Sequence, residues 1–472
     1  MDAKVHAAPS PTPTLTAGMI NARLDRLPGT RRIWTLVLLL SLGGWFEFYD
    51  LFFTAYVGPG LVKSGILAET TEAFFGFSGL AAFIAATFAG LFIGTCVFGF
   101  AADRFGRRTV FTVSLLCYTA CTVVMAFQTS AAGLNLWRLL AGVGIGVEFV
   151  TIDSYVAELV PGHMRGRAFA FNQMVMYSVV PFVALLAYLL VPEAPLGLDG
   201  WRWVVLIGAV GAVFVWFIRL GVPESPRWLA QHGRLAEADR IVSKIEARVA
   251  AEFGAPLPEP GPAIEPATVE RGRFAEIFSP EYRGRTIMLM VFNFFQTIGY
   301  YGFASWVPTL LVARGITVTH SLLYSFVIAI ANPIGPLLAL PFADRVERKW
   351  AIVFGAGGIA VFGVAFSQVD DARALIALGA CITLCLCIMS FGFHAYQPEL
   401  FPTRVRARAI GFVYSMSRLS AMLSGFTIAF ALRNFGASGA FTLIVGSMVV
   451  VVTAIGVFGP RTRGFQLEAI TH

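Results

Sequence analysis

Residues 137–167, WRLLAGVGIGVEFVTIDSYVAELVPGHMRGR, begin as an apolar run and end in a basic cluster. The apolar run also contains Arg138, Glu148 and Asp153. Ionisable side chains are costly in the hydrocarbon core of a bilayer, so those that occur there usually face a cavity or a partner. This stretch therefore predicts a membrane helix that carries functional or structural charges.

The end of this stretch recurs later in the chain. Tyr155-x-x-Glu158-Leu-x-Pro161 followed by Arg165-x-Arg167-Ala168 returns as Tyr396-x-x-Glu399-Leu-x-Pro402 followed by Arg406-x-Arg408-Ala409. The same offset of 241 positions carries Asp103, Arg104, Arg107 and Arg108 onto Asp344, Arg345, Arg348 and Lys349. Two loops in register at one offset indicate a duplicated chain. Six spans in each copy leave both copies in the same orientation, and a substrate site is then expected between them near the middle of the membrane.

The composition agrees with a membrane protein. Of the 472 residues, 57% are hydrophobic and only 13% are charged, whereas soluble proteins are about half apolar and about one quarter charged. Apolar runs of roughly 20 residues, long enough to cross a bilayer core, recur from residue 33 to residue 459. The sequence predicts an all-α polytopic protein and leaves no room for a large soluble domain.

The apolar runs and the turn signals between them predict about twelve transmembrane helices. They are expected near residues 33–58, 76–102, 108–128, 132–159, 167–192, 201–221, 286–312, 320–343, 349–367, 372–397, 407–432 and 437–459. The predicted units are an N-terminal tail (1–32), a six-helix half (33–221), a linker (222–284), a second six-helix half (285–459) and a C-terminal tail (460–472). Within the linker, residues 234–252 have the apolar spacing of an amphipathic surface helix.

The charges are distributed unevenly between the loops. Arginines cluster in alternate loops, whereas the intervening loops carry single cations such as Lys63 and Arg314. This alternation follows the positive-inside rule and places both termini in the cytoplasm. Anionic lipid head groups therefore account for the net charge of +7, and we expect no nucleic-acid partner. All six cysteines lie in apolar runs without a nearby histidine or carboxylate, so we expect no metal site.

The loop after the second predicted helix reads GFAADRFGRR, from Gly99 to Arg108. Its aspartate can accept hydrogen bonds from a helix N-terminus, and its arginines can pair with Glu158 or with helix C-termini. Such pairs between rigid helices can break and re-form, so they can shift the balance between two conformations of the whole protein. The expected gating residues are Asp103, Arg104, Arg107, Arg108, Glu158, Arg165, Asp344, Arg345, Glu399 and Arg406.

This loop resembles the G-x-x-x-D-R-x-G-R-R signature of the major facilitator superfamily, and the resemblance covers essentially the whole chain. Pro223-Glu-Ser-Pro-Arg-Trp and Arg138-x-x-x-Gly142-x-Gly144-x-Gly146 resemble its sugar-porter and metabolite–proton symporter branches. The resemblance implies twelve helices in two pseudo-repeated halves and secondary transport. The C-terminal Pro460-Arg-Thr-Arg-Gly464 departs from the sugar-porter ending, because arginine replaces the usual glutamate.

Three acids are candidates for proton coupling. Glu47 and Asp50 lie three residues apart in the first helix and share a helical face. Desolvation of a mid-membrane carboxylate favours its protonated form, which suits reversible protonation. Aromatic-acid and phosphate symporters carry a similar acidic pair, and phosphate symporters have an acid where Glu148 stands. A structural salt bridge or a packing hydrogen bond remains the alternative for the pair, and Asp153 is expected to pair with a loop arginine.

Arg418 is the predicted substrate-binding cation. It stands about midway along the eleventh predicted helix, and a buried guanidinium can hold a carboxylate through two hydrogen bonds. An internal ion pair with Glu148 or with an acid of the first helix is the alternative. Arg138 lies less than two turns from the outer end of the fourth helix, where its side chain can reach the interface, so we expect it to be structural.

The seventh predicted helix carries a polar stripe of Asn293, Gln296 and Tyr300 among aromatic residues. Such a stripe facing a cavity suits a small ring with polar groups. Tyr177 and Asn332 are further candidates for substrate binding, and His394 is interpreted as a packing residue. The glycines of the fourth helix are interpreted as helix-packing positions rather than as a nucleotide loop.

The sequence thus predicts a monomeric secondary transporter of a bacterial inner membrane, with no cofactor and no enzymatic activity. We expect a proton symporter that imports a small organic anion, such as a nicotinate-like aromatic carboxylate, by alternating access. A sugar or polyol symporter and a drug exporter are the alternatives within this class. A transporter-like receptor without net flux is the alternative from another class.

Overall fold

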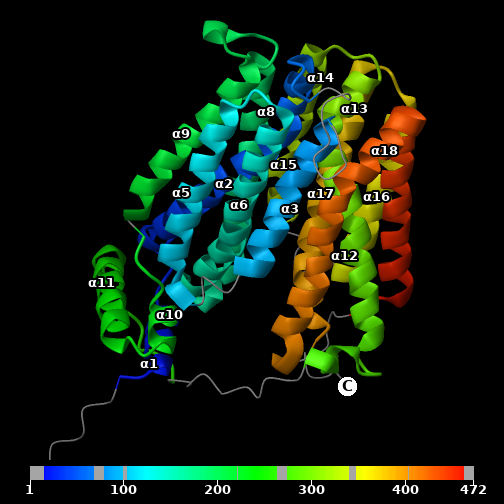
Figure 1. Cartoon of the computed structure of the whole chain (residues 1–472). Coiled ribbons are helices and arrows are strands. Elements are labelled where there is room, and N and C mark those ends of the chain that lie inside the picture. The colour runs from blue at the N-terminus through cyan, green and yellow to red at the C-terminus, as the bar shows by residue number, and fades with distance from the viewer. Residues whose placement is uncertain are drawn as a thin grey trace, which may run out of the picture.

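The computed structural model describes residues 15–67, 79–98, 104–220, 222–262, 274–339, 347–401 and 403–461. Within these ranges the side chains of some helical residues, including Glu148, Asp153 and Arg406, lie outside the description. The described residues fold into a bundle of long helices (Figure 1). The predicted all-α membrane fold with twelve transmembrane helices in two pseudo-repeated halves is confirmed.

The first half contains five continuous helices and one interrupted span. The continuous helices are α2 (Arg31–Lys63), α3 (Gly79–Phe98), α5 (Arg107–Ala126), α6 (Ala131–Leu159) and α9 (Gly200–Leu220). The remaining span, which the sequence predicted as one helix at 167–192, consists of α7 (Arg165–Tyr177) and α8 (Val179–Leu190). Pro181 has no N–H to donate to the carbonyl of Tyr177, four residues earlier, and this explains why α7 ends there.

The second half is interrupted more often. Its helices are α12 (Arg283–Ala304), α13 (Val307–Ala313), α14 (Val318–Ala329), α15 (Ala331–Ala339), α16 (Arg348–Gln368), α17 (Ala372–Glu399) and α18 (Thr403–Phe458). Pro308 and Pro333 each follow the last residue of α12 and α14 by four positions. In α18, Gly436 adopts φ 67° and ψ −167°, a conformation that glycine tolerates best. It separates the two helices predicted at 407–432 and 437–459.

Helices α3 and α6 pack backbone to backbone through glycines. A Cβ added at Gly90 would lie 2.2 Å from the carbonyl oxygen of Leu139, and one added at Gly146 would lie 2.4 Å from that of Leu91. Gly94 and Gly142 meet the facing backbone at similarly short distances. The predicted packing role of the α6 glycines agrees with this geometry, because small residues allow membrane helices to approach closely.

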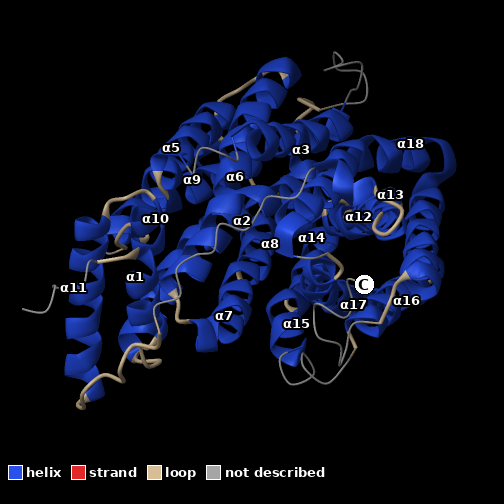
Figure 2. Ribbon diagram, turned by 90° about the horizontal axis from the view of Figure 1, so that it is seen from below, coloured by secondary structure: helices blue, strands red, loops and turns tan. Residues whose placement is uncertain are grey.

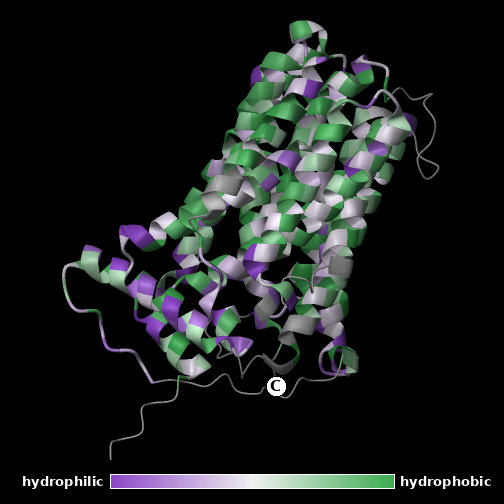
Figure 3. Ribbon diagram, turned by 60° about the vertical axis from the view of Figure 1, so that its left-hand side comes forward, coloured by the Kyte–Doolittle hydropathy of each residue, from purple (hydrophilic) through white to green (hydrophobic). Residues whose placement is uncertain are grey.

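A peripheral layer covers one end of the first half. We call this the basic end, because Arg107, Arg165 and Arg348 begin α5, α7 and α16 there. The layer consists of α1 (Ala17–Asp25), α10 (Pro226–Gln231) and α11 (Leu235–Phe253), with α1 beside α10 and α11 (Figures 1 and 2). Its polar surface contrasts with the apolar bundle in Figure 3. The amphipathic helix predicted at 234–252 is α11.

The sequence analysis did not identify α1, which lies in the segment predicted as a tail. Its side chains Ile20 and Leu24 are fully buried. Arg23 and Arg26 both donate hydrogen bonds to the Glu246 carboxylate of α11, at 2.6 Å each. Burial alone would raise the pKa of Glu246, but the hydrogen bonds from the two arginines lower it below its usual value.

Glu252 of α11 joins the same layer to the transmembrane bundle. Its two carboxylate oxygens accept hydrogen bonds from the backbone N–H groups of Arg31 and Arg32, at 2.8 and 2.9 Å. These N–H groups belong to the first turn of α2 and have no partner within the helix. An acidic group also interacts favourably with the N-terminal end of the helix dipole. The peripheral layer therefore caps the first transmembrane helix.

We expect Gly146→Ala to destabilise the protein by about 1–3 kcal/mol, because the added methyl group overpacks a backbone contact that cannot move independently. The melting temperature in detergent should fall by several degrees. Gly357→Ala in α16 is the matched control, because an added Cβ there meets no atom within 4 Å. Equal melting temperatures for the two variants would contradict the close α3–α6 contact.

Removal of the Glu246 charge should loosen α1. Charge-assisted hydrogen bonds contribute about 1.5–3 kcal/mol, so Glu246→Gln should lower the hydrogen-exchange protection of residues 17–25 on the order of tenfold or more. Because the folded-state pKa is lowered, this contribution is present at neutral pH and is lost as the pH falls through that pKa. Glu237→Gln removes an acid whose side chain is 47% exposed and pairs with Arg234 three residues earlier, and it should leave α1 unchanged. Protection of α1 that is insensitive to Glu246→Gln would contradict the role of this ion pair.

Candidate functional site

A cavity lies between the two halves of the bundle, and we call it the central cavity. It offers about 70 Å³ to the centres of water molecules, and one water needs roughly 10–15 Å³, so several waters fit. Its apolar side consists mainly of Phe48, Leu51, Phe52, Ile152, Met176 and Phe393. Its polar side consists of Gln173, Tyr177, Gln296, Thr297, Tyr300, Tyr301, Ser390, His394, Tyr414, Ser417 and Arg418.

Arg418 is the cation of the described cavity lining. Its side chain is 4% exposed, and its guanidinium carbon lies 5.2 Å from the centre of the Tyr414 ring. The Tyr301 hydroxyl lies within hydrogen-bonding reach of the guanidinium. No carboxylate belongs to the part of the lining that the structure describes. The cavity therefore presents a positive charge among aromatic rings.

Two tyrosines connect the halves across the cavity. The hydroxyl oxygens of Tyr177 in α7 and Tyr300 in α12 lie 3.0 Å apart and form a hydrogen bond. Gln296, one turn before Tyr300, donates to the hydroxyl of Thr297 at 2.7 Å. The structure thus brings together Tyr177, Gln296, Tyr300 and Arg418, four of the six side chains predicted to bind substrate. Asn332, a fifth, lines a neighbouring cavity instead.

Asn293, the sixth candidate, does not belong to the described lining of the central cavity. Its side chain is fully buried and donates hydrogen bonds to the carbonyl of Leu289 and to the side-chain oxygen of Gln397, at 2.8 and 3.1 Å. The polar stripe of α12 therefore turns away from the cavity towards α17 at this level. Asn293 packs two helices of the second half together.

His394 was interpreted as a packing residue, but it lines the central cavity. Its Nδ1 lies 2.8 Å from the carbonyl oxygen of Ser390. A carbonyl can only accept, so this contact assigns the proton to Nδ1 and leaves Nε2 as the acceptor of the neutral ring.

The second group of charges lies within the first half, outside the cavity. Arg138 of α6 is fully buried, and its Nη1 lies 2.9 Å from the Asp50 carboxylate of α2. The same guanidinium donates to the hydroxyls of Thr54 and Thr87, at 2.6 and 2.8 Å. Thr122 of α5 donates to the other carboxylate oxygen at 3.1 Å. The expectation that Arg138 reaches the interface is wrong, because the side chain turns inward to this network.

Glu47, the other predicted acid of α2, is also fully buried. Phe48, Leu51 and Phe52 of the same helix line the central cavity, and at roughly 3.6 residues per turn Glu47 lies closer to their face of α2 than Asp50 does. This places Glu47 nearer to the cavity than Asp50. The candidate side chains of Glu148 and Asp153 lie outside the described residues.

The loop charges at the basic end form equivalent pairs in the two halves. Arg107 at the start of α5 donates to Glu158 at the end of α6, at 2.8 Å. In the second half, Arg348 at the start of α16 forms an ion pair with Glu399 at the end of α17. The predicted pairing of a loop arginine with Glu158 is confirmed. Arg104 is exposed and Arg165 begins α7, whereas Asp103, Asp344 and Arg345 lie outside the described residues.

Two tyrosines strengthen this correspondence. Tyr155 donates a hydrogen bond to the carbonyl of Pro223, and its repeat partner Tyr396 donates to the carbonyl of Pro460 at 2.8 Å. Glu224, next to Pro223, accepts from the backbone N–H of Arg107 at 3.1 Å. In each half, the segment that follows the last helix therefore forms hydrogen bonds near the loop charges of the same half.

The sequence analysis did not predict several polar residues of the cavity. Tyr414, Ser417 and Arg418 share one face of α18, and all three line the cavity. Ser417 and Arg418 follow Tyr414 by three and four residues, and this spacing was the available signal. Ser390, Tyr301 and Gln173 gave no comparable pattern, because tertiary packing alone decides whether they face the cavity.

Comparison with known proteins identifies the family. The model of the family described as "Sugar (and other) transporter" matches residues 36–472. A niacin transporter of Acinetobacter baylyi is 27% identical, with 95% of this chain and 99% of the relative covered. An inner membrane metabolite transport protein of Escherichia coli is 29% identical, with 96% and 98% covered.

Solved structures show the same fold. The xylose transporter XylE from E. coli, in a partially occluded inward-open conformation, superposes with a TM-score of 0.73 at 21% identity, over 93% of this chain and all of that chain. The helical bundle of this chain therefore has a known architecture. This chain belongs to the sugar (and other) transporter family and is a membrane transporter of the major facilitator superfamily.

Proposed function

We propose that the protein is a proton symporter that imports a small organic anion, with an aromatic carboxylate of the nicotinate type as the substrate class. The observation that carries this proposal is Arg418 in the central cavity, beside Tyr301 and Tyr414. A guanidinium binds a carboxylate through two parallel hydrogen bonds, and tyrosine rings offer faces on which an aromatic ring can stack.

The size of the cavity supports a small substrate. Room for several waters suits a single ring with one or two polar groups after modest side-chain movement. Gln173 and Gln296 supply neutral hydrogen-bonding groups on opposite halves, which can recognise a ring nitrogen or a hydroxyl. One similar protein is named a niacin transporter, which is consistent with this substrate class.

A sugar or polyol is the second candidate substrate. The amides, hydroxyls and aromatic rings of the cavity also suit sugar hydroxyls, and a protein of the same fold is named a xylose transporter. Arg418 favours the anion, because a neutral substrate leaves a desolvated cation without charge compensation by the ligand.

Proton coupling is assigned to the acids of α2. Asp50 holds Arg138 inside the first half, and protonation of Asp50 would remove the ion pair while leaving both side chains in place. Loss of such a pair between rigid helices shifts the balance between two packing arrangements. Glu47 lies nearer to the cavity and is the alternative proton carrier, and Glu148 remains a third candidate.

We further propose that the basic end faces the cytoplasm of a bacterium and that both termini lie on that side. The arginines at the starts of α5, α7 and α16 support this orientation through the positive-inside rule. The Arg107–Glu158 and Arg348–Glu399 pairs then lie on the cytoplasmic side. Their rupture and re-formation would accompany alternating access.

Replacement of Arg418 tests the substrate class. A charge-assisted hydrogen bond contributes about 1.5–3 kcal/mol, so Arg418→Ala should weaken nicotinate or benzoate binding on the order of 10- to 100-fold in counterflow assays with proteoliposomes. Arg418→Lys keeps the charge without the planar fork and should show an intermediate loss. Methyl nicotinate should compete poorly with nicotinate on the wild type. Unchanged nicotinate counterflow in Arg418→Ala, or xylose as the stronger competitor, would contradict the carboxylate proposal.

Replacement of Asp50 tests the coupling. Asp50→Asn should abolish accumulation driven by a pH gradient but retain counterflow, which needs no net proton movement. Because the change leaves Arg138 buried without its counter-charge, a cost of about 3–5 kcal/mol is expected, and the melting temperature must be measured in parallel. Glu47→Gln is the matched comparison from the same helix. Normal gradient-driven accumulation by a folded Asp50→Asn variant would exclude Asp50 as the proton carrier.

A further inference from the structure

A second cavity lies next to the central cavity, displaced away from the basic end. We call it the outer chamber. Helix α12 starts at the basic end, and the chamber is lined by its last part and by α13, through Phe303, Ala304 and Val307. Helix α17 ends at the basic end, and its chamber residues Thr383 and Leu386 precede its cavity residues Ser390 and His394. The chamber offers about 30 Å³ to the centres of water molecules, or roughly two waters.

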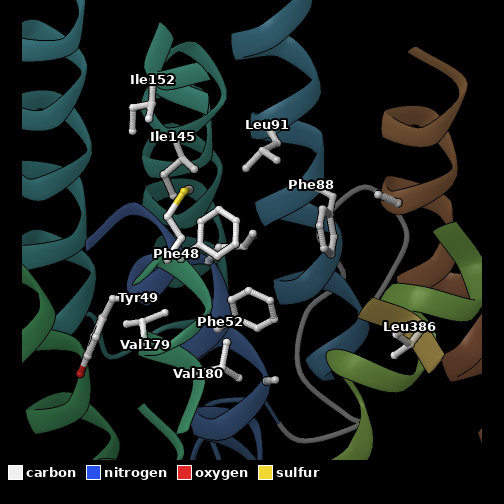
Figure 4. Close-up of a cluster of buried hydrophobic side chains, with 14 of the residues drawn as sticks. Phe48, Tyr49, Phe52, Phe88, Leu91, Ile145, Ile152, Val179, Val180 and Leu386 are labelled. Carbon is white, nitrogen blue, oxygen red and sulfur yellow. The ribbon is translucent and has the colours of Figure 1, made fainter. Parts of the chain in front are cut away.

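Two aromatic side chains separate the outer chamber from the central cavity. Phe52 of α2 and Tyr300 of α12 line both spaces. The Tyr300 hydroxyl is held by Tyr177 across the halves, and the Phe52 ring lies 6.5 Å from the Tyr177 ring. Figure 4 shows Phe52 beside Val180, which also lines the chamber. The partition therefore consists of one apolar ring and one hydrogen-bonded tyrosine.

The outer chamber contains the hydroxyl group of Ser325, which can bind a ligand. Ser325 of α14 is 2% exposed and lines the chamber. Among the described residues, its Oγ has no hydrogen-bond partner. A buried hydroxyl without a partner is unfavourable, and natural structures usually satisfy such a group with protein, water or ligand. Ser325 is therefore placed to bind a molecule that enters the chamber.

The lining of the chamber restricts the chemistry of that molecule. Its described residues include hydroxyls and the amide of Asn332 but no Asp, Glu, Lys, Arg or His. A carboxylate is thus favoured next to Arg418 and disfavoured in the chamber, where a charge loses its hydration without an ionic partner. An uncharged group that donates or accepts hydrogen bonds fits the chamber.

We propose that the outer chamber is a second subsite, which receives the uncharged end of a substrate whose carboxylate is held at Arg418. Phe52 limits the length of the substrate that fits in the central cavity. Ser325 binds the polar group of a longer substrate that extends past the partition. This inference rests on the proposed carboxylate site and adds the length and the far substituent of the substrate as determinants of specificity.

The test measures competition against radiolabelled benzoate by the purified full-length protein. Its probes are benzoate, 4-acetamidobenzoate and 4-propylbenzoate, which share the carboxylate but differ at the far end. Phe52→Ala opens the partition, so the affinity ratio of each longer acid to benzoate should rise at least tenfold relative to the wild type. Phe52→Leu keeps a bulky apolar side chain and should retain the wild-type ratios.

Ser325→Ala distinguishes the effect of the hydrogen bond to Ser325 from the effect of the volume that Phe52→Ala opens. In the Phe52→Ala background it should weaken 4-acetamidobenzoate about tenfold and change 4-propylbenzoate less than twofold. Two results would overturn the subsite: equal affinity ratios in the wild type and Phe52→Ala, or equal losses of affinity for both longer acids on adding Ser325→Ala. Benzoate binding in the same experiment would still uphold the proposed function. Absence of benzoate and nicotinate binding to the folded wild type would overturn the proposed function and this inference with it.

Discussion

The ion pair between Asp50 and Arg138 is the interaction on which the packing of the first half depends. It joins α2 to α6, and its surrounding hydroxyls come from α2, α3 and α5. Removing two charges from water costs several kcal/mol per ion, and hydrophobic residues of similar size often serve stability as well. A gain in stability alone therefore does not account for this pair, which is consistent with the proposed role of Asp50 in coupling.

The three helix interruptions provide a second constraint, because they surround the two cavities. Helices α7, α12 and α14 each end four residues before a proline, which cannot donate to the carbonyl at that position. Such interruptions are tolerated in membranes only where the released backbone groups face protein or a cavity. Tyr177 is the last residue of α7, and Tyr300 lies one turn before the end of α12. The hydrogen bond between the halves is therefore formed where both helices stop.

The sequence predicted the long apolar helices and the repeated loop charges. Hydropathy can be read from consecutive residues, and the duplication from a constant offset between two sequence motifs. The cavity-facing positions of Arg418 and Gln296 were also predictable, since a charged or amide side chain in mid-membrane has few other places to face. The direction of Arg138 was not predictable, because it depends on Asp50 and Thr54 of α2 and on Thr87 of α3. Asn293 shares a helical face with Gln296, and only the position of Gln397 on α17 decides that it faces a neighbouring helix. Helix α1 was missed because its burial depends on two arginines that reach α11, and no local pattern records that contact.

The duplicated halves have diverged in their cores but not at their ends. The offset of 241 positions carries Arg107 and Glu158 onto a second ion pair, formed by Arg348 and Glu399. At the same offset Arg138 corresponds to Gly379, and Arg418 corresponds to Tyr177. The buried pair thus belongs to the first half and the cavity cation to the second. If Asp50 carries the proton and Arg418 holds the substrate, the two functions lie in different halves, and relative movement of the halves can couple the two events. This division couples proton movement to substrate movement. Proton binding in the first half, or substrate binding in the second half, does not by itself change the side of the membrane to which the cavity opens.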